Sequence, residues 1–200
     1  MTLATRKLLD RSFTACAVMA VVLLTAFLFF VLAPIFTRGS RAYIFKGTVE
    51  YRRMMYDHFG RGDLLKLNQE IDAVTARRAP VYAALNTFEQ ELAQMPAKQR
   101  RELKPVFKEV REETIALLGP EPGKPLPALP RMVYGQTRWD GARRHLRHVL
   151  FEESWDYSDN EESVRVFLPR RPLFEGTALE PLFEILENDL ESLLNPKLTF

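Results

Sequence analysis

The sequence predicts a mainly helical protein, in which one N-terminal transmembrane helix precedes a mostly helical extramembrane domain with little β-structure. Three observations lead to this fold class. A single long apolar run lies near the N-terminus, apolar residues recur at steps of three and four through most of the remaining chain, and only one short segment alternates in the manner of a strand. Two hundred residues are enough for one membrane anchor and one modest domain.

The apolar run covers residues 13–36, reads FTACAVMAVVLLTAFLFFVLAPIF and contains no Asp, Glu, Lys, Arg or His. A helix of this length spans about 36 Å, whereas the hydrocarbon core of a bilayer is about 30 Å thick. A cleaved signal peptide has a shorter apolar region, of about 7–15 residues, before a small-residue cleavage site. A buried core helix of so small a domain rarely lacks charge over such a length. The run therefore predicts a transmembrane helix.

Charge leaves the orientation of this helix open. Three basic residues precede the run within residues 1–12, and five follow it between residues 38 and 53. Counted alone, these charges favour a domain on the cytoplasmic side. Long domains, however, cross the membrane largely regardless of charge, so the count does not decide the side.

The net charge of +2 hides an uneven distribution. Residues 1–150 have a balance of +10 and residues 151–200 a balance of −8. The basic residues are dispersed over predicted helix faces, and no basic strand with interleaved aromatic residues occurs, so no nucleic-acid partner is predicted. The two halves either attract each other or simply have solvated charged faces.

Residues 37–118 read as a helical region with three helices. Thr48 suits an N-cap and Gly60 a C-terminal glycine for the first helix, and Asp63 suits the N-cap of the second. The second helix runs to Met95, with Pro80 expected to kink or split it. A third helix fits residues 97–118, where Pro105 suggests a late start. The last two helices should form an antiparallel hairpin that turns at residues 95–97.

The rest of the chain divides into a Pro-rich linker and a mixed, mostly helical region. Residues 119–130, GPEPGKPLPALP, read as a semi-rigid linker, with a PxxP ligand as the alternative. The predicted divisions of the chain are a short tail at 1–12, the transmembrane helix at 13–36, the helical region at 37–118, the linker at 119–130 and the mixed region at 131–200.

Within the mixed region, two capping-box patterns predict helix starts. Residues 137–140 precede a helix that runs to about Leu150, and residues 177–180 open a helix over 178–194. Between them, residues 163–168 alternate in strand fashion. The last helix should present its apolar residues on one face: Leu179, Leu182, Phe183, Leu186, Leu190 and Leu194.

Two histidine clusters are candidates for chemistry. His145 and His148 have a spacing that can present two imidazoles to a metal, with Glu152 or Glu153 as a third ligand. The neighbouring arginines would repel a cation, so a solvated basic face beside two acids is the favoured interpretation. His58 has acidic neighbours at Asp57 and Asp63, but neighbours in sequence usually point apart on a helix, and an acid–base pair needs spatial convergence.

No motif of a hydrolase, a zinc protease, a P-loop or a dinucleotide site occurs. The chain has one cysteine, Cys16, so it has neither an internal disulfide nor a Cys/His zinc pattern. The sequence therefore predicts no enzyme activity, no catalytic, cofactor-binding or metal-binding residue, and no cofactor.

Three stretches of the chain resemble the start of a PstA-type permease subunit of the phosphate ABC transporter, in the subgroup with a long insertion after the first membrane helix. They cover nearly the whole chain and read RKLLDRSFTACAVMAVVLLTAFLFFVLAPIFTRGSRAYIFKGTVEYRRMMYDHFGRGD, YGQTRWDGARRHLRHVLFEESWDY and FEGTALEPLFEILENDLESLLNPKLTF. The resemblance implies a bacterial inner-membrane protein with its N-terminus in the cytoplasm and residues 37–200 outside it. It also implies partners besides the bilayer: a second permease subunit, an ATPase subunit and a periplasmic phosphate-binding protein.

The chain departs from this family in having no second apolar run of 18 residues. Such permeases continue into several more membrane helices, so we expect the chain to be a membrane-anchored N-terminal portion without the transport core. No transport residue is carried over. The alternatives are a single-span scaffold whose helical domain binds a protein partner, and a membrane-anchored enzyme, which would need a converging polar site.

Overall fold

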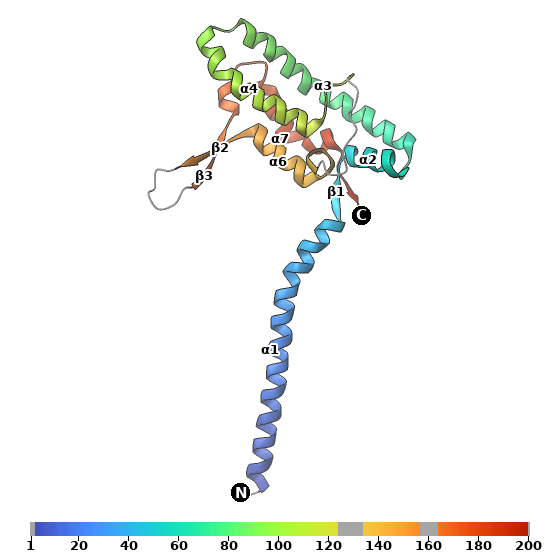
Figure 1. The fold of residues 1–200 in the computed structure, drawn as a ribbon, viewed down its shortest axis with the longest axis vertical. Coiled ribbons are helices and arrows are strands. Elements are labelled where there is room, and N and C mark those ends of the chain that lie inside the picture. Colours follow the sequence, from blue (N-terminus) through green and yellow to red (C-terminus); the bar gives the residue numbers. More distant parts are fainter. Residues whose placement is uncertain (1–2, 124–133, 157–163, 200) are drawn as a thin grey trace. The chain divides into compact units, whose positions relative to one another are not determined.

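The computed structural model describes residues 3–123, 134–156 and 164–199. The chain forms two compact units, an N-terminal one that ends at Phe45 and a second one from Lys46 to Thr199, which we call the helical body. The fold is mainly helical, with one long apolar N-terminal helix and few short strands, as the sequence predicts (Figure 1).

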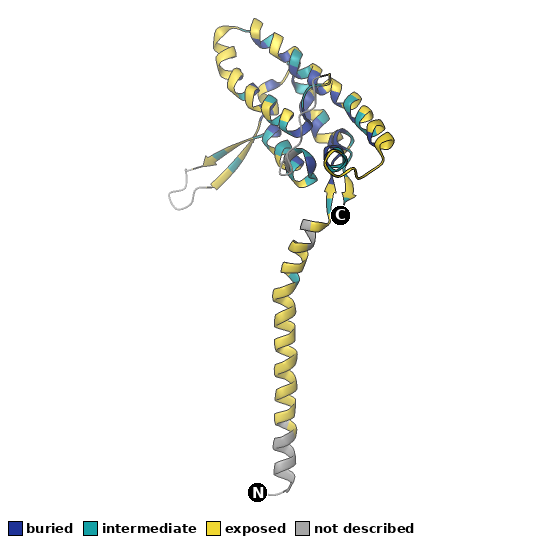
Figure 2. Cartoon of the chain, turned by 45° about the vertical axis from the view of Figure 1, so that its right-hand side comes forward, coloured by how far each residue is buried: buried dark blue, intermediate teal, exposed yellow. Residues whose placement is uncertain are grey.

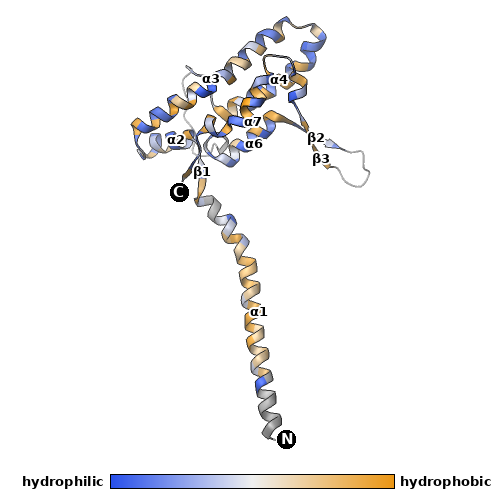
Figure 3. Cartoon of the chain, turned by 180° about the vertical axis from the view of Figure 1, so that it is seen from behind, coloured by the Kyte–Doolittle hydropathy of each residue, from blue (hydrophilic) through white to orange (hydrophobic). Residues whose placement is uncertain are grey.

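The N-terminal unit consists of helix α1, Leu3–Tyr43. Its segment Phe13–Gly39 is long and apolar enough to be a membrane span or a signal sequence, and none of it is buried inside the structure. Figure 3 shows α1 in the hydrophobic colour along most of this segment. The predicted span, 13–36, lies within it, and the helix continues beyond both predicted ends.

Strand β1 (Phe45–Gly47) spans the boundary between the two units, and helix α2 (Val49–Phe59) follows it in the body. The hydroxyl of Thr48 accepts a hydrogen bond from the amide of Tyr51, and Gly60 adopts the left-handed conformation that ends the helix, so both predicted caps are confirmed. The carboxylate of Asp63 caps helix α3 (Leu64–Gln94), as predicted, by accepting hydrogen bonds from the amides of Leu65 and Lys66. Left-handed backbone suits glycine because it has no Cβ.

Helices α3 and α4 (Ala97–Leu118) form the predicted helical hairpin, and the late start suggested by Pro105 is wrong. α3 continues through Pro80 without splitting, and α4 begins at Ala97, well before Pro105. A proline has no N–H, so the carbonyls four residues before Pro80 and Pro105, those of Ala76 and Arg101, lose their usual donor. All four residues lie at exposed positions. Water can therefore bond to those carbonyls, and packing of the opposite face stabilises each helix despite its proline.

The second half of the body contains these elements: α5 (Tyr134–Thr137), α6 (Trp139–Leu150), β2 (Phe151–Asp156), β3 (Val164–Pro169), the 3-10 turn η1 (Arg171–Phe174), α7 (Glu180–Leu194) and β4 (Lys197–Thr199). The predicted strand is confirmed as β3. Its antiparallel partner β2, which directly follows α6, was not predicted from the sequence. Residues 124–130 of the predicted linker lie outside the described residues.

The capping box predicted at residues 137–140 is wrong. The N-cap of α6 is Arg138, and its side chain makes no capping bond. Thr137 instead ends α5, and its carbonyl accepts the amide of Thr48. At the second box, α7 begins at Glu180 rather than 178. The Glu180 carboxylate accepts from the amide of Gly176 and the Thr177 hydroxyl accepts from the amide of Leu179, so the reciprocal bonds of a capping box do not form.

The core of the body lies between α3, α4, α6 and α7. Phe88 of α3 is fully buried, with its ring centroid 4.9 Å from that of Phe107 and 5.3 Å from that of Phe174. All six apolar residues predicted for the inner face of the last helix are buried, from Leu179 to Leu194. Elements before and after the Pro-rich segment therefore share one core, and Figure 2 shows these buried positions in dark blue.

Candidate functional site

The structure does not bring the predicted histidine candidates together into a site. His145 Nδ1 lies 2.7 Å from Glu113 Oε2 on α4, which joins α6 to α4. His58 is exposed, and the acid beside it in sequence, Asp57, pairs with Arg53 at 3.4 Å. Asp63 is engaged in capping α3. Among residues 3–123, 134–156 and 164–199, no group of three or more His, Cys, Asp or Glu side chains could hold a metal ion.

A charged junction joins the two ends of the helical body. Arg52 on α2 donates to the Glu70 carboxylate at 2.6 Å and to the carbonyl of Asn195 at 3.0 Å. Lys197 on β4 also donates to Glu70. Burial by itself raises the pKa of Glu70, but the hydrogen bonds and charges of Lys197 and Arg52 outweigh it and lower the pKa below its ordinary value.

The first and last strands of the body meet at the same junction. β1 pairs with β4, and the amide of Gly47 donates to the hydroxyl of Thr199 at 3.0 Å. A Cβ at position 47 would lie 2.6 Å from that hydroxyl, so glycine permits this close approach. Lys46 Nζ also lies 3.6 Å from the carboxylate of Glu191. The chain therefore enters and leaves the body at one place.

A second charged group, Arg78, is buried inside the body. Its guanidinium lies 2.7 Å from the carboxylate of Glu50 and donates to the carbonyls of Leu193 at 2.8 Å and Leu118 at 2.5 Å. Arg78 thus ties α2 to the last turns of α4 and α7. One oxygen of Glu50 and one nitrogen of Arg78 have no hydrogen-bond partner among the described residues, and the adjoining space of about 30 Å³ has room for a water molecule.

A hollow of about 160 Å³ lies between α3, α4 and the start of the Pro-rich segment. Tyr82 at its edge donates to the carbonyl of Gly119 at 2.6 Å, and burial raises the pKa of Tyr82 to about 12. The polar groups of the lining bond to other groups of the body: Asn86 donates to Glu121, and Arg111 pairs with Glu89. These contacts serve the fold and present no convergent set of groups to a ligand.

The β2–β3 hairpin exposes four large apolar side chains, those of Trp155, Val164, Phe167 and Leu168. Figure 1 shows it extending away from the helices, and no third strand pairs with it among the described residues. Arg170 fixes its base: the side chain is buried, its guanidinium donates to Glu109 of α4 at 2.6 Å, and its amide donates to the carbonyl of Leu150. The hairpin therefore has a fixed base and two accessible faces.

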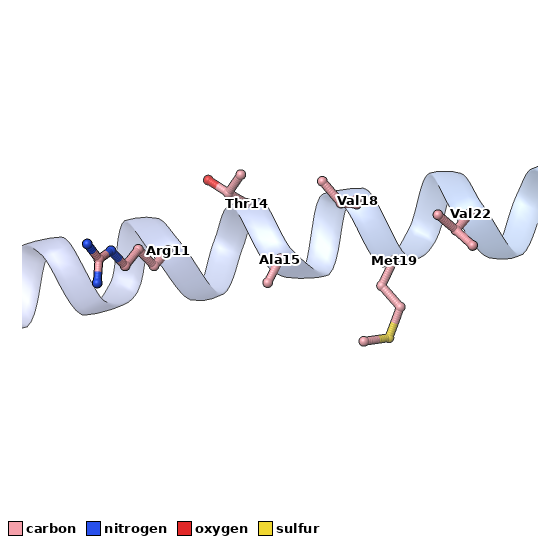
Figure 4. A pocket seen from close by; sticks show the side chains of 6 residues that line it. All are labelled: Arg11, Thr14, Ala15, Val18, Met19 and Val22. Atoms are coloured by element: carbon pink, nitrogen blue, oxygen red, sulfur yellow. The ribbon is translucent and has the colours of Figure 1, made fainter.

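Between residues 13 and 39, the described side chains of helix α1 are mainly apolar and no group of polar side chains converges there. Figure 4 shows six residues from Arg11 to Val22 standing out from the helix, and all but Arg11 and Thr14 are apolar. Thr25 donates its hydroxyl to the carbonyl of Val21 in its own helix, at 2.8 Å. A hydroxyl that makes its hydrogen bond within its own helix can lie in an apolar environment.

Sequence reasoning missed three of these features. Arg78 sits between Val74 and Tyr82 in the apolar stripe of α3, so a charged residue at a stripe position was the available signal. Strand β2 reads FEESWD, with three acids that conceal its pairing, and nothing local indicates that β1 meets β4.

No known protein family, curated protein or solved structure matches this chain.

Proposed function

We propose that this chain is the membrane-anchored N-terminal portion of a PstA-type permease subunit for phosphate import, with α1 as its first membrane helix and the helical body as an extracytoplasmic domain. The transport path belongs, in this proposal, to membrane helices outside these 200 residues and to a second permease subunit. An ATPase and a phosphate-binding protein complete the assembly.

The junction of the body is the observation that carries this proposal. A domain inserted between two membrane helices has to leave the membrane and return to it within a short distance. The pairing of β1 with β4, the Gly47–Thr199 hydrogen bond and the contacts of Arg52 supply that geometry. Chain ends that lie close together are the usual property of domains that tolerate insertion into another protein.

The apolar surface of α1 supports the membrane part of the proposal. Leu24, Phe27 and Phe30 are 71%, 69% and 79% exposed. A helix that is apolar all round is suited to lipid, since every backbone polar group is satisfied within the helix.

Accessibility of a single cysteine tests the orientation. Asn188 is exposed on α7, so Asn188→Cys in a Cys16→Ala background offers one thiol on the body. We expect a membrane-impermeant maleimide to label it in intact spheroplasts. The unaltered chain is the matched control, because lipid should shield Cys16 until detergent is added. Labelling of the body only after lysis would contradict the proposed orientation.

Phosphate uptake tests the transport role. Cells depleted of the protein should lose uptake of radiolabelled phosphate and keep uptake of sulfate, and the tagged protein should co-purify with an ATPase subunit from mild detergent. Unchanged phosphate uptake would overturn the permease proposal.

A single-span scaffold is the second candidate function, and the hairpin favours it. Exposed apolar residues on a protruding hairpin are a common property of protein-interaction surfaces. Normal phosphate uptake together with a stable protein partner would decide for the scaffold.

A further inference from the structure

A small cavity lies between α2 and the first half of α3, two helices that pack against each other (Figure 1). Its volume is about 30 Å³, which is about the share of one molecule in liquid water. Three apolar and four polar side chains line it: Val49, Ile71 and Val74, and Glu50, Arg53, Thr75 and Arg78. The cavity therefore has the size of a water molecule and a partly polar lining.

Two charged side chains of the lining each have one polar atom without a partner. Glu50 and Arg78 are both 8% exposed and pair with each other, with Arg78 Nη1 2.7 Å from Glu50 Oε1. Glu50 Oε2 and Arg78 Nη2 have no hydrogen-bond partner among the described residues. A buried donor or acceptor that loses its water and gains no other bond destabilises the folded state. The cavity thus adjoins one unsatisfied acceptor and one unsatisfied donor.

The size and the charge of the cavity select its ligand. A volume of about 30 Å³ excludes molecules much larger than water. The charges of Glu50 and Arg78 cancel, so a cation would face the guanidinium and an anion would face the carboxylate. Arg53 also lines the cavity, and its guanidinium pairs with Asp57 at 3.4 Å. A neutral molecule that both donates and accepts a hydrogen bond suits both free atoms.

We propose that this cavity is a binding site for one water molecule, which donates a hydrogen bond to Glu50 Oε2 and accepts one from Arg78 Nη2. The hydroxyl of Thr75, which also lines the cavity, is a further partner. Buried waters in proteins typically make about three hydrogen bonds to polar groups that would otherwise be unsatisfied. The inference goes beyond the proposed function, because it depends neither on the membrane nor on transport.

The bound water completes the hydrogen bonding of a residue on which four helices converge. Arg78 also donates to the carbonyls of Leu118 and Leu193, in the last turns of α4 and α7. Glu50 belongs to α2, so the water connects α2 to α3 at the point where α3 contacts the ends of the other two helices. The water therefore helps to hold α2, the first helix of the body, in its position.

Nuclear magnetic resonance on the full chain in detergent micelles tests the proposal. Val49 and Val74 line the cavity, although each is only 2% exposed. With isotopically labelled valine methyl groups, we expect a nuclear Overhauser effect between water and the methyl protons of these two residues. Val149 is the matched control, because it is fully buried in the main core and does not line the cavity, so it should show no such effect.

Two variants identify the source of the signal. Glu50→Met with Arg78→Met removes both free polar atoms, so the effect at Val74 should fall to the level of Val149, while far-UV circular dichroism shows whether the body stays folded. Thr75→Val is the milder variant, which leaves the ion pair and its free atoms in place. It removes a hydroxyl proton that exchanges with water and could relay the effect, so the effect at Val74 should persist in this variant.

Four outcomes would overturn the proposal. Val49 and Val74 show no more effect than Val149, or the effect at Val74 is lost in Thr75→Val, which would make the hydroxyl its source. The effect persists in a folded Glu50→Met, Arg78→Met variant, so that it does not depend on the two free atoms. The effect disappears when sodium chloride is added, which would mean that an ion occupies the cavity.

Discussion

Helices α1 and α7 are built from the same apolar residue types but have opposite surroundings. Leu182, Phe183 and Leu186 of α7 are fully buried against the core of the body. Leu24 and Phe27 of α1 are about 70% exposed. α7 confines its leucines to one face and carries acids on the other, whereas α1 is apolar all round.

This difference teaches that apolar content and burial within the chain are separate properties. The stripe of α7 matches a protein core, because a stripe leaves a polar face for water. The uniform surface of α1 matches a surrounding that is apolar on every side, and that surrounding is not supplied by the described residues of this chain. Each prediction below tests whether the two helical parts respond differently to the same kind of change.

The largest expected effect comes from removing a core ring. Phe88→Ala should lower the free energy of unfolding of the body by about 3–5 kcal/mol, because it empties a site between Phe107 and Phe174. Phe27→Ala in α1 removes the same atoms and should leave that free energy unchanged. Urea unfolding of the full chain in mild detergent, followed by tryptophan fluorescence, measures both. Equal losses of unfolding free energy in the two variants would mean that Phe27 stabilises the body as much as Phe88 does.

Removal of the buried cation should have the next largest effect. Arg78→Met leaves the carboxylate of Glu50 buried without its charge partner, which costs about 3 kcal/mol. The double variant Glu50→Met with Arg78→Met should lose less than the sum of the two single variants. Additive losses in the same unfolding experiment would mean that the two groups do not act as a pair.

A smaller effect should follow from loss of a helix cap. Thr48→Ala removes the hydroxyl that accepts from Tyr51 and donates to the carbonyl of Gln136, so the body should lose about 1 kcal/mol. Thr25→Ala is the counterpart in α1, where the hydroxyl bonds only within its own helix. The midpoint of thermal unfolding of the body should fall for the first variant alone.

The smallest effect concerns acid. The pKa of Glu70 is lower in the folded body than in the unfolded chain, so the unfolded state binds more protons as pH falls. The stabilisation is fully present above the unfolded pKa of a glutamate and is lost as pH falls through the folded pKa. In the Glu70→Gln variant, the free energy of unfolding should therefore fall less steeply as the pH is lowered, as measured by urea unfolding at a series of acidic pH values. An equally steep fall would show that the junction does not hold this carboxylate in its charged form.

The parts of the fold that could be predicted depend on local chemistry. The apolar run, the caps at Thr48 and Asp63 and the apolar face of α7 each follow from side chains within a few residues of one another. The bounds of α4 also match the prediction from apolar spacing, and only the late start suggested by Pro105 is wrong, because an exposed proline inside a helix loses one hydrogen bond that water replaces.

The junction and the hairpin depend on residues far apart in the chain. Gly47 and Thr199 are separated by 152 positions, and no local pattern connects them. The hydrogen bond between Arg78 and the carbonyl of Leu193 spans 115 positions. The only local sign of it is that Arg78 is a charged residue in an apolar stripe, where its guanidinium requires hydrogen-bond acceptors.

The two ends of the body, at Lys46 and Thr199, lie on paired strands, and this arrangement is useful for protein engineering. A domain whose two ends form neighbouring strands can be transplanted as a cassette into a tight turn of a host protein without long spacers. The host would keep its own geometry, since the distance to be bridged is the separation of two paired strands, about 5 Å. We expect residues 46–199 to keep their fold after such a transplant, and their unfolding could then be followed inside the host protein.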